Sequence, residues 1–279
     1  HLEQMVGGAY SLYAAHMVER LGGVHIFVAD DRDSAAYLVN DLYELLDEEH
    51  VGFFASGYKR SAAYGAEDAQ GIVRRTAALN AIKNFKRGYL VICTYPEALA
   101  ESVADEERLA EQSLHLAVGD TMQQASLVEW LSTHNFTRVD FVYEPGQYSV
   151  QGGLVDIFSY VESKPYRVDF FGDVIDSLRR FDISSQLSAE RPDEVDIIPN
   201  MLSDSGVSKR VSLATFAAEA TWWMADGDHI LRKIADIRKK VLETAESEED
   251  AERLAQRVTS RQRLLEELKG QTLVLRRNN

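Results

Sequence analysis

The feature that most constrains the fold is a series of short segments, between residues 136 and 188, in which apolar and polar residues alternate. The stretch VYEPGQYSVQGGLVDIFSY, residues 142–160, is interrupted at Pro145-Gly146 and again at Gly152-Gly153. Alternation of period two between such turns is typical of half-buried strands joined in hairpins. Together with one helix at SLVEWLSTHNF, these segments predict a small α+β unit with an antiparallel sheet over about 119–197.

The flanking regions have a different periodicity. Before residue 119, helical segments alternate with short apolar runs such as VHIFVAD and YLVICTYP, which predicts an α/β layer on a mostly parallel sheet. After residue 198, helical periodicity returns in SLATFAAEATWWM, HILRKIADIRKKVLETAE and EEDAERLAQRVTSRQRLLEELKG. The predicted fold class is therefore α/β, with a small antiparallel α+β domain inserted.

Charge and composition narrow the classes of partner. The formal net charge of −15 disfavours general binding to nucleic acid, which needs a basic surface, and favours a protein partner. No apolar run approaches the roughly 20 residues of a membrane span, and the single cysteine, Cys93, fits a reducing cytoplasm. The seven histidines form no pair at ligand spacing, so we expect no metal site. The chain starts without Met or a signal-peptide pattern, so we expect a longer parent protein.

A glycine pair near the start, in VGGAYSLYAA, is the first candidate for chemistry, because phosphate-binding loops place glycines before a helix. Such a loop needs Lys before its Ser or Thr. Here Gly7 and Gly8 are followed by Tyr10 and Ser11, and no lysine occurs before Lys59. The pattern predicts a turn into a helix that cannot perform nucleotide chemistry.

The second candidate is the face of the predicted sheet that points away from its core. In PYRVDFF, period two separates Tyr166, Val168 and Phe170 from Arg167, Asp169 and Phe171. In RVDFVYE and QYSVQG it assigns one set of side chains to the core, namely Val139, Phe141, Tyr143, Tyr148 and Val150. It assigns the rest to solvent, namely Arg138, Asp140, Gln147, Ser149 and Gln151. Arginine beside an exposed aromatic is typical of interface hot spots, although ordinary cross-strand pairing of solvent-facing residues is the alternative.

The same segments resemble a known family. VDFVYEPGQYSVQGGLVDIFSY, PYRVDFFGDVIDSLRRFD and SSQLS are similar to the second domain at the amino-terminal end of bacterial transcription-repair coupling factors (Mfd), a region itself similar to the repair helicase UvrB. FFASGYKRSAAYG and VICTYPEAL resemble the same family. The resemblance implies a degenerate helicase-like domain 1a at 1–118, domain 2 at 119–197, and a mainly helical domain 1b at 198–279.

The resemblance also implies a function and a site. Domain 2 of the family recruits the damage-recognition ATPase UvrA, and the matching positions are Arg138, Gln151, Arg167, Asp169 and Phe171. An arginine is common in the family where this chain has Gln151, and UvrB has another at Ser149, so Arg167 and Phe171 are expected to contribute more of the contact here.

The nucleotide loop of UvrB is intact, whereas Tyr10 stands about where its lysine would be. The segment before RRTAALNAIKNF is too short for the long DNA-clamping hairpin of UvrB.

The expected function is a non-enzymatic adaptor in transcription-coupled nucleotide excision repair, without cofactor and cytoplasmic. RNA polymerase and DNA would be bound by other parts of the parent, itself expected to be an ATP-dependent DNA translocase. One alternative is an NTP-dependent, DNA-binding enzyme like UvrB, whose melting temperature ATP would raise. Another is an autoinhibitory module in which the same face packs against other domains of the parent.

Overall fold

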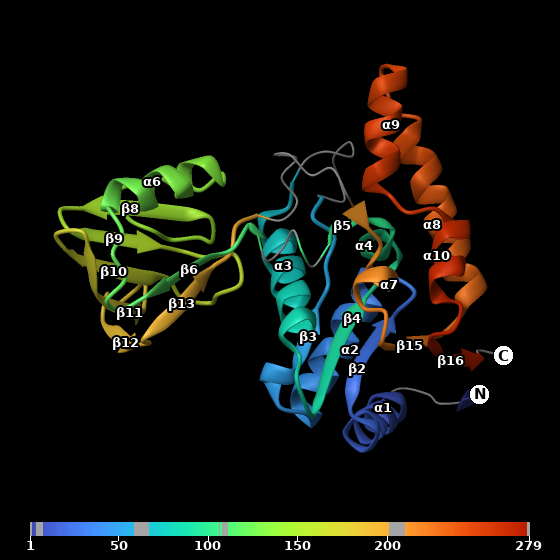
Figure 1. Cartoon of the computed structure of the whole chain (residues 1–279). Helices are drawn as coiled ribbons and strands as arrows, with labels where there is room; N and C mark the ends of the chain where they lie inside the picture. The colour runs from blue at the N-terminus through green and yellow to red at the C-terminus, as the bar shows by residue number, and fades with distance from the viewer. Residues whose placement is uncertain are drawn as a thin grey trace. The chain divides into compact units, whose positions relative to one another are not determined.

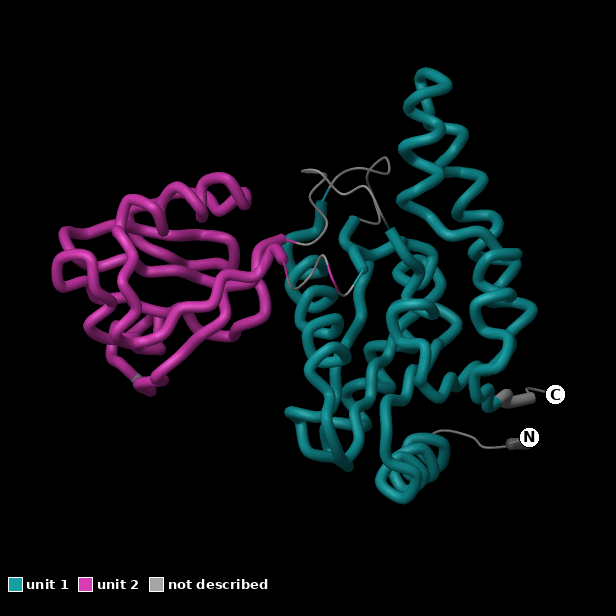
Figure 2. Tube along the Cα trace, viewed as in Figure 1, with its two compact units in different colours: residues 1–106, 207–279 teal, residues 107–206 magenta. Residues whose placement is uncertain are grey.

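The computed structural model describes residues 2–3, 8–58, 67–105, 107, 111–200 and 210–277. Two compact units are present: unit 1 comprises residues 1–106 and 207–279, and unit 2 comprises residues 107–206 (Figure 2). The boundaries expected near residues 118 and 197 fall inside unit 2, because β6 (Leu114–Ala117) pairs there with β13 (Glu194–Ile197).

Unit 1 contains a sheet whose six strands are all parallel. In spatial order they are β1 (Leu2–Glu3), β16 (Thr272–Arg277), β15 (Thr221–Met224), β2 (Gly23–Val28), β4 (Tyr89–Thr94) and β3 (Val51–Phe53). The central strands are continuous apolar runs because helices cover a parallel sheet on both faces. The predicted α/β class with a parallel sheet is confirmed.

Helices connect the strands of unit 1. They are α1 (Gly8–Leu21), α2 (Arg32–Leu45), α3 (Ala69–Asn84), α4 (Pro96–Ala100), α7 (Leu213–Phe216), α8 (Gly227–Leu242), α9 (Glu248–Arg257) and α10 (Arg261–Leu268), with a 3₁₀ turn at Glu48–His50 (Figure 1). Two short strands, β5 (Val103–Ala104) and β14 (Arg210–Val211), pair antiparallel where the chain leaves for unit 2 and where it returns.

One helix predicted for the C-terminal region is wrong. Within SLATFAAEATWWM only Leu213–Phe216 is helical, and TWWM is strand β15, which lies between β2 and β16. Trp222 and Trp223 are both fully buried. Both tryptophan side chains therefore pack in the core around the parallel sheet. The C-terminal region supplies two strands of this sheet, β15 and β16.

Buried His25 on β2 gives unit 1 a pH dependence. Its Nε2 donates to Gly22 O at 2.9 Å, and its Nδ1 accepts from Trp223 Nε1 at 3.1 Å. If Nδ1 were protonated, its N–H would face the N–H of Trp223 Nε1, so two donors would meet without an acceptor. Burial of the ring lowers the pKa of His25 below 6.5.

We therefore expect the free energy of unfolding to be fully maintained above about pH 6.5 and to fall as the pH drops, because the unfolded chain takes up this proton first. Urea unfolding of the wild type and of His25→Gln, on either side of that pH, checks this. Equal pH dependence in both proteins would contradict the assignment.

Unit 2 is built on a six-stranded sheet. Its spatial order is β12 (Ser188–Glu190), β11 (Val174–Phe181), β10 (Tyr166–Phe171), β9 (Leu154–Ile157), β8 (Gln147–Gln151) and β7 (Thr137–Arg138). The pairs from β12 to β8 are antiparallel, as predicted, whereas β7 joins β8 in parallel. Of the strand expected over RVDFVYE, residues 138–144, only Arg138 lies in a strand, as the last residue of β7.

The core of unit 2 lies on one face of this sheet. Helix α6 (Gln124–Thr133) supplies Leu127 and Leu131 to that core, and the β6–β13 pair supplies Leu116 and Ile197. They pack against the side chains that alternation assigned to the core in β10, Tyr166, Val168 and Phe170. The opposite face of the sheet is the one that carries the candidate site.

In the part of the chain that the structure describes, no helix is both long and apolar enough to cross a bilayer.

Candidate docking face of the second unit

Cross-strand register defines the composition of the face opposite the core. One row across the sheet contains Ser149, Asp156, Arg167 and Arg179, and the next contains Gln151, Leu154, Asp169 and Ser177. A bulge in the β10–β11 register follows, after which Phe171 lies opposite Val174. Directly paired residues point to the same side of a sheet, so these ten residues form one surface, here called the polar face.

Arg167 at the centre of the polar face is held by its neighbours. Its Nε and Nη2 donate to the two carboxylate oxygens of Asp156, both at 2.7 Å, and Nη2 also donates to Gln186 Oε1 at 3.2 Å. The guanidinium carbon lies 4.4 Å from the centroid of the Phe181 ring. The bond to Asp156 raises the pKa of Arg167, and 22% of its side chain is exposed. Arg167 thus presents a rigid, partly covered guanidinium.

Asp169 and Phe171 differ in how freely they face solvent. Asp169 Oδ2 accepts from Arg179 Nη2 at 3.3 Å, with both side chains about a third exposed. Phe171 is 82% exposed, beside Val174 at 39%. Burial of such a ring against a partner is favourable by about 25 cal/mol per Å² of apolar surface. Phe171 is therefore the more exposed of the two apolar side chains at this end of the face.

The remaining predicted residues lie toward the other edge of the sheet. Gln151 is exposed at the end of β8, and its Nε2 donates to Asp140 O at 3.1 Å. Arg138 is exposed on β7, in register with buried Tyr148 and so outside the rows of the polar face. Ser149 lies in a row of the face but is only 1% exposed. The structure therefore brings Gln151, Arg167, Asp169 and Phe171 onto one face, whereas Arg138 is paired with a residue of the core side and does not belong to that face.

Two aromatic residues are misassigned by alternation. Phe141 and Tyr143 were expected in the core, yet they are 55% and 63% exposed, while Val142 between them is buried. The reason is that β7 ends at Arg138, so the period-two pattern does not continue into the segment that follows. Pro145-Gly146, a turn signal directly after this segment, is the sequence feature that could have warned of an irregular loop.

The candidate nucleotide loop is only partly described, since Gly7 lies outside the described residues, as do residues 59–66 of the segment compared with the UvrB hairpin. Gly8 begins α1. The Tyr10 ring packs edge-on against Phe27 with centroids 6.4 Å apart, and buried Ser11 donates from Oγ to Asp41 Oδ2 at 2.6 Å. The hydroxyl that would hold Mg²⁺ in a working loop is thus engaged by a carboxylate.

A cavity of about 360 Å³ next to this loop is unsuited to phosphate. Its described lining includes the carboxylates of Asp30 and Asp41 and neither lysine nor arginine. The nearby N-terminus of α2 is capped by Asp31, which accepts from Ser34 N at 2.8 Å, and this bond lowers the pKa of Asp31. Since phosphates bind where helix N-termini and cations are available, the protein's own carboxylates disfavour an anion here.

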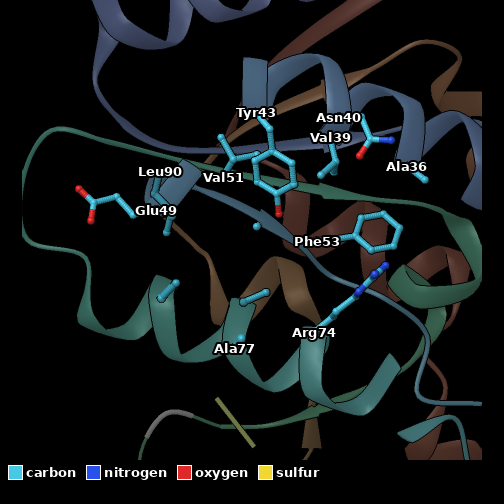
Figure 3. A pocket seen from close by; sticks show the side chains of 13 residues that line it. Ala36, Val39, Asn40, Tyr43, Glu49, Val51, Phe53, Arg74, Ala77 and Leu90 are labelled. Carbon is cyan, nitrogen blue, oxygen red and sulfur yellow. The ribbon is translucent and has the colours of Figure 1, made fainter. Parts of the chain in front are cut away.

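A second cavity, of about 320 Å³, lies along β3 between α2 and α3 (Figure 3). Small and apolar side chains form most of it, and the charged groups Glu49 and Arg74 lie at opposite ends of the view. Arg74 stacks over the Phe53 ring, with its guanidinium carbon 5.6 Å from the ring centroid, instead of pairing with an acidic group of the cavity. No group of three or more His, Cys, Asp or Glu in the described ranges is arranged to hold a metal ion.

Comparison with known proteins agrees with these observations. Residues 114–202, nearly all of unit 2, match the family described as UvrB interaction domain. The chain is 27% identical over 199 residues to the transcription-repair-coupling factor of Escherichia coli K12, an alignment that covers 71% of this chain and 17% of that protein. It is 26% identical over 198 residues to the same-named protein of Haemophilus influenzae, covering 71% of this chain and 17% of that protein. It is 32% identical over 132 residues to that of Myxococcus xanthus, covering 47% and 11%. These alignments thus cover less than a fifth of the length of the relatives. The resemblance inferred from the sequence is confirmed.

Proposed function

We propose that this chain, which carries a UvrB interaction domain and resembles the transcription-repair-coupling factors, is a non-enzymatic adaptor that recruits UvrA through the polar face of unit 2. The observation that carries the proposal is Phe171, 82% exposed at the end of β10 within the matched segment. Arg167 and Asp169 lie on the same side of that strand. Polar residues around an exposed aromatic ring suit the docking of a partner protein.

The adaptor role is supported by the first unit as well. By the sequence resemblance, Tyr10 falls about where a nucleotide loop would need lysine, and Ser11 is bonded to Asp41. The described lining of the adjoining cavity includes the carboxylates of Asp30 and Asp41 and no lysine or arginine. These features favour an adaptor over an NTP-dependent helicase-like enzyme. The parent protein would supply the translocase activity and the binding of RNA polymerase and DNA, in the cytoplasm, and its other domains are further candidates to cover the polar face.

Replacing Phe171 by alanine tests the proposal. We expect the affinity for UvrA to fall at least about tenfold, because a central aromatic hot spot contributes 2 kcal/mol or more. The stability should change by less than about 0.5 kcal/mol, since the ring is exposed. Isothermal titration calorimetry with UvrA measures the affinity, and circular dichroism monitors the fold.

Tyr37→Ala is the matched control, because Tyr37 is 74% exposed but lies in unit 1. It should bind UvrA like the wild type. If Phe171→Ala also binds with unchanged affinity, UvrA does not dock on the polar face and the proposal fails.

A further inference from the structure

The segment between β7 and β8, residues 139–146, exposes two large aromatic rings that the function proposed above does not use. Phe141 and Tyr143 are 55% and 63% exposed, while Val142 between them is 2% exposed. Scattered single apolar residues on a surface are ordinary, but two rings on one short segment are unusual. We call residues 139–146 the aromatic loop.

Hydrogen bonds hold the backbone of the aromatic loop at several places, including its end, where Gly146 N donates to Phe158 O at 2.7 Å. Val139 N donates to Tyr148 O at 2.9 Å, and Gln151 Nε2 donates to Asp140 O at 3.1 Å. Gln147 Oε1 accepts from the backbone N–H groups of Tyr143 and Glu144, at 2.8 and 3.1 Å.

Together with the buried Val142 side chain, these bonds fix the backbone on both sides of each ring. Since a loop that is already ordered loses little entropy on binding, both rings are prepared to act as anchors.

The loop lies beside the same end of the sheet as Phe171. Gln151, which holds Asp140, is opposite Leu154, and Leu154 is opposite Asp169. Adjacent strands are about 4.8 Å apart, so Gln151 and Asp169 are separated by roughly 10 Å. Phe171 follows Asp169 by two residues on the same side of β10. An interface of standard size buries about 800 Å² on each partner, which is large enough to include both places.

Exposed carboxylates accompany the rings. Asp140 precedes Phe141, and Glu144 follows Tyr143, both with exposed side chains. A partner that covers this loop must offer apolar pockets for the rings, and basic groups at their rim would match the two carboxylates.

We infer that the aromatic loop is a second anchor of the docking surface, with Phe141 and Tyr143 entering apolar, basic-rimmed pockets on UvrA. Gln147 and Gln151 are positioning residues that fix the loop. The inference rests on the proposed function and extends it to residues outside the polar face. It also gives Gln151 a role: its hydrogen bond to Asp140 O fixes the backbone next to Phe141 and so positions that ring. This role would replace the charged contact expected of the arginine that is common in the family at the position of Gln151.

Calorimetry with UvrA and the complete 279-residue chain tests the inference. We expect Phe141→Ala and Tyr143→Ala each to weaken binding about tenfold while the melting temperature stays that of the wild type. Gln151→Ala should weaken binding in the wild-type background, and by less when Phe141 is already alanine, since it acts through that ring. A contact role of its own would instead give the same loss in both backgrounds.

Tyr37→Ala, an exposed aromatic of unit 1, is the matched control and Phe171→Ala the reference. If Phe171→Ala weakens binding but Phe141→Ala and Tyr143→Ala each change it less than twofold, the aromatic loop is not an anchor and the proposed function stands. If Phe171→Ala also binds like the wild type, the proposed function itself fails. The two failures are therefore distinguishable in one series of titrations.

Discussion

Arg75→Ala is expected to lower the free energy of unfolding of unit 1 by about 3 to 5 kcal/mol, because it leaves the buried Glu101 carboxylate without its cation. The side chains of Arg75 and Glu101 are 2% and 3% exposed, with Nη1 and Oε2 3.2 Å apart. Arg75 Nη1 also donates to Ala55 O and Ala98 O, both at 3.2 Å, and Nη2 to Glu101 O at 2.8 Å.

The consequences of this loss extend beyond one ion pair. Four backbone carbonyls would lose their bond from Arg75. The guanidinium, whose central carbon lies 4.1 Å from the centroid of the Phe54 ring, would also no longer cover that ring. On the other side, Glu101 accepts from Ser56 Oγ and from Gly57 N, so the segment after β3 would lose part of its anchoring to α4. Lysine cannot replace this planar fork, and Arg75→Lys should destabilise as well.

Urea unfolding followed by tryptophan fluorescence measures the effect, since Trp222 and Trp223 are buried in unit 1. Arg74→Ala, one residue away and exposed, is the matched control and should cost less than about 1 kcal/mol. The double variant Arg75→Met with Glu101→Leu should recover much of the stability, because no unpaired charge remains. If Arg75→Ala lowered the free energy of unfolding by less than about 1 kcal/mol, the buried Arg75–Glu101 pair would not be important for the stability of unit 1.

Arg167→Ala is expected to act on both stability and binding. Asp156 is 7% exposed and accepts two hydrogen bonds from Arg167. Without Arg167 its buried carboxylate would lose both donors, which should lower the free energy of unfolding of unit 2 by about 2 to 3 kcal/mol. Loss of affinity for UvrA in this variant alone is therefore ambiguous between a missing contact and a damaged sheet.

The double variant Arg167→Ala with Asp156→Ala separates the two effects. Removal of both charges should restore most of the stability lost in the single variant, as in other charge pairs. Under the proposed function we expect affinity for UvrA to remain at least tenfold reduced, because the polar face would lack the guanidinium. If the double variant recovered both wild-type stability and wild-type affinity, Arg167 would not contact UvrA. Its role would then be to stabilise the sheet of unit 2.

The sequence correctly predicts a parallel α/β sheet in unit 1 and a mostly antiparallel sheet in unit 2, because in most segments the local periodicity matches the element that forms. In β10, alternation correctly separates Tyr166, Val168 and Phe170 from the polar face, and Phe171 is exposed as expected. The bidentate partner of Arg167 could not be identified, since Asp156 is reached through strand register rather than through sequence spacing.

The errors come from tertiary context. TWWM continues a helical pattern in sequence, but its neighbours in space are β2 and β16, and burial between them makes it a strand. Similarly, alternation through RVDFVYE predicts a full strand, whereas after Val139 the backbone of the aromatic loop is bonded to the side chains of Gln147 and Gln151 in β8 and does not continue the ladder. Such choices depend on partners distant along the chain, which a local pattern does not contain.

The placement of β15 also bears on how the chain is made. Ribosomes release the N-terminus first, and β15 and β16 lie between β1 and the strands β2, β4 and β3 of the parallel sheet. The nascent first half of unit 1 therefore emerges with a side of β2 uncovered until residues 221–224 have been synthesised. Unit 2, contiguous in sequence, has all its strands available earlier. We therefore expect unit 2 to be able to fold on the ribosome while the unit that surrounds it in sequence is still incomplete, with the side of β2 that pairs with β15 left uncovered in the meantime.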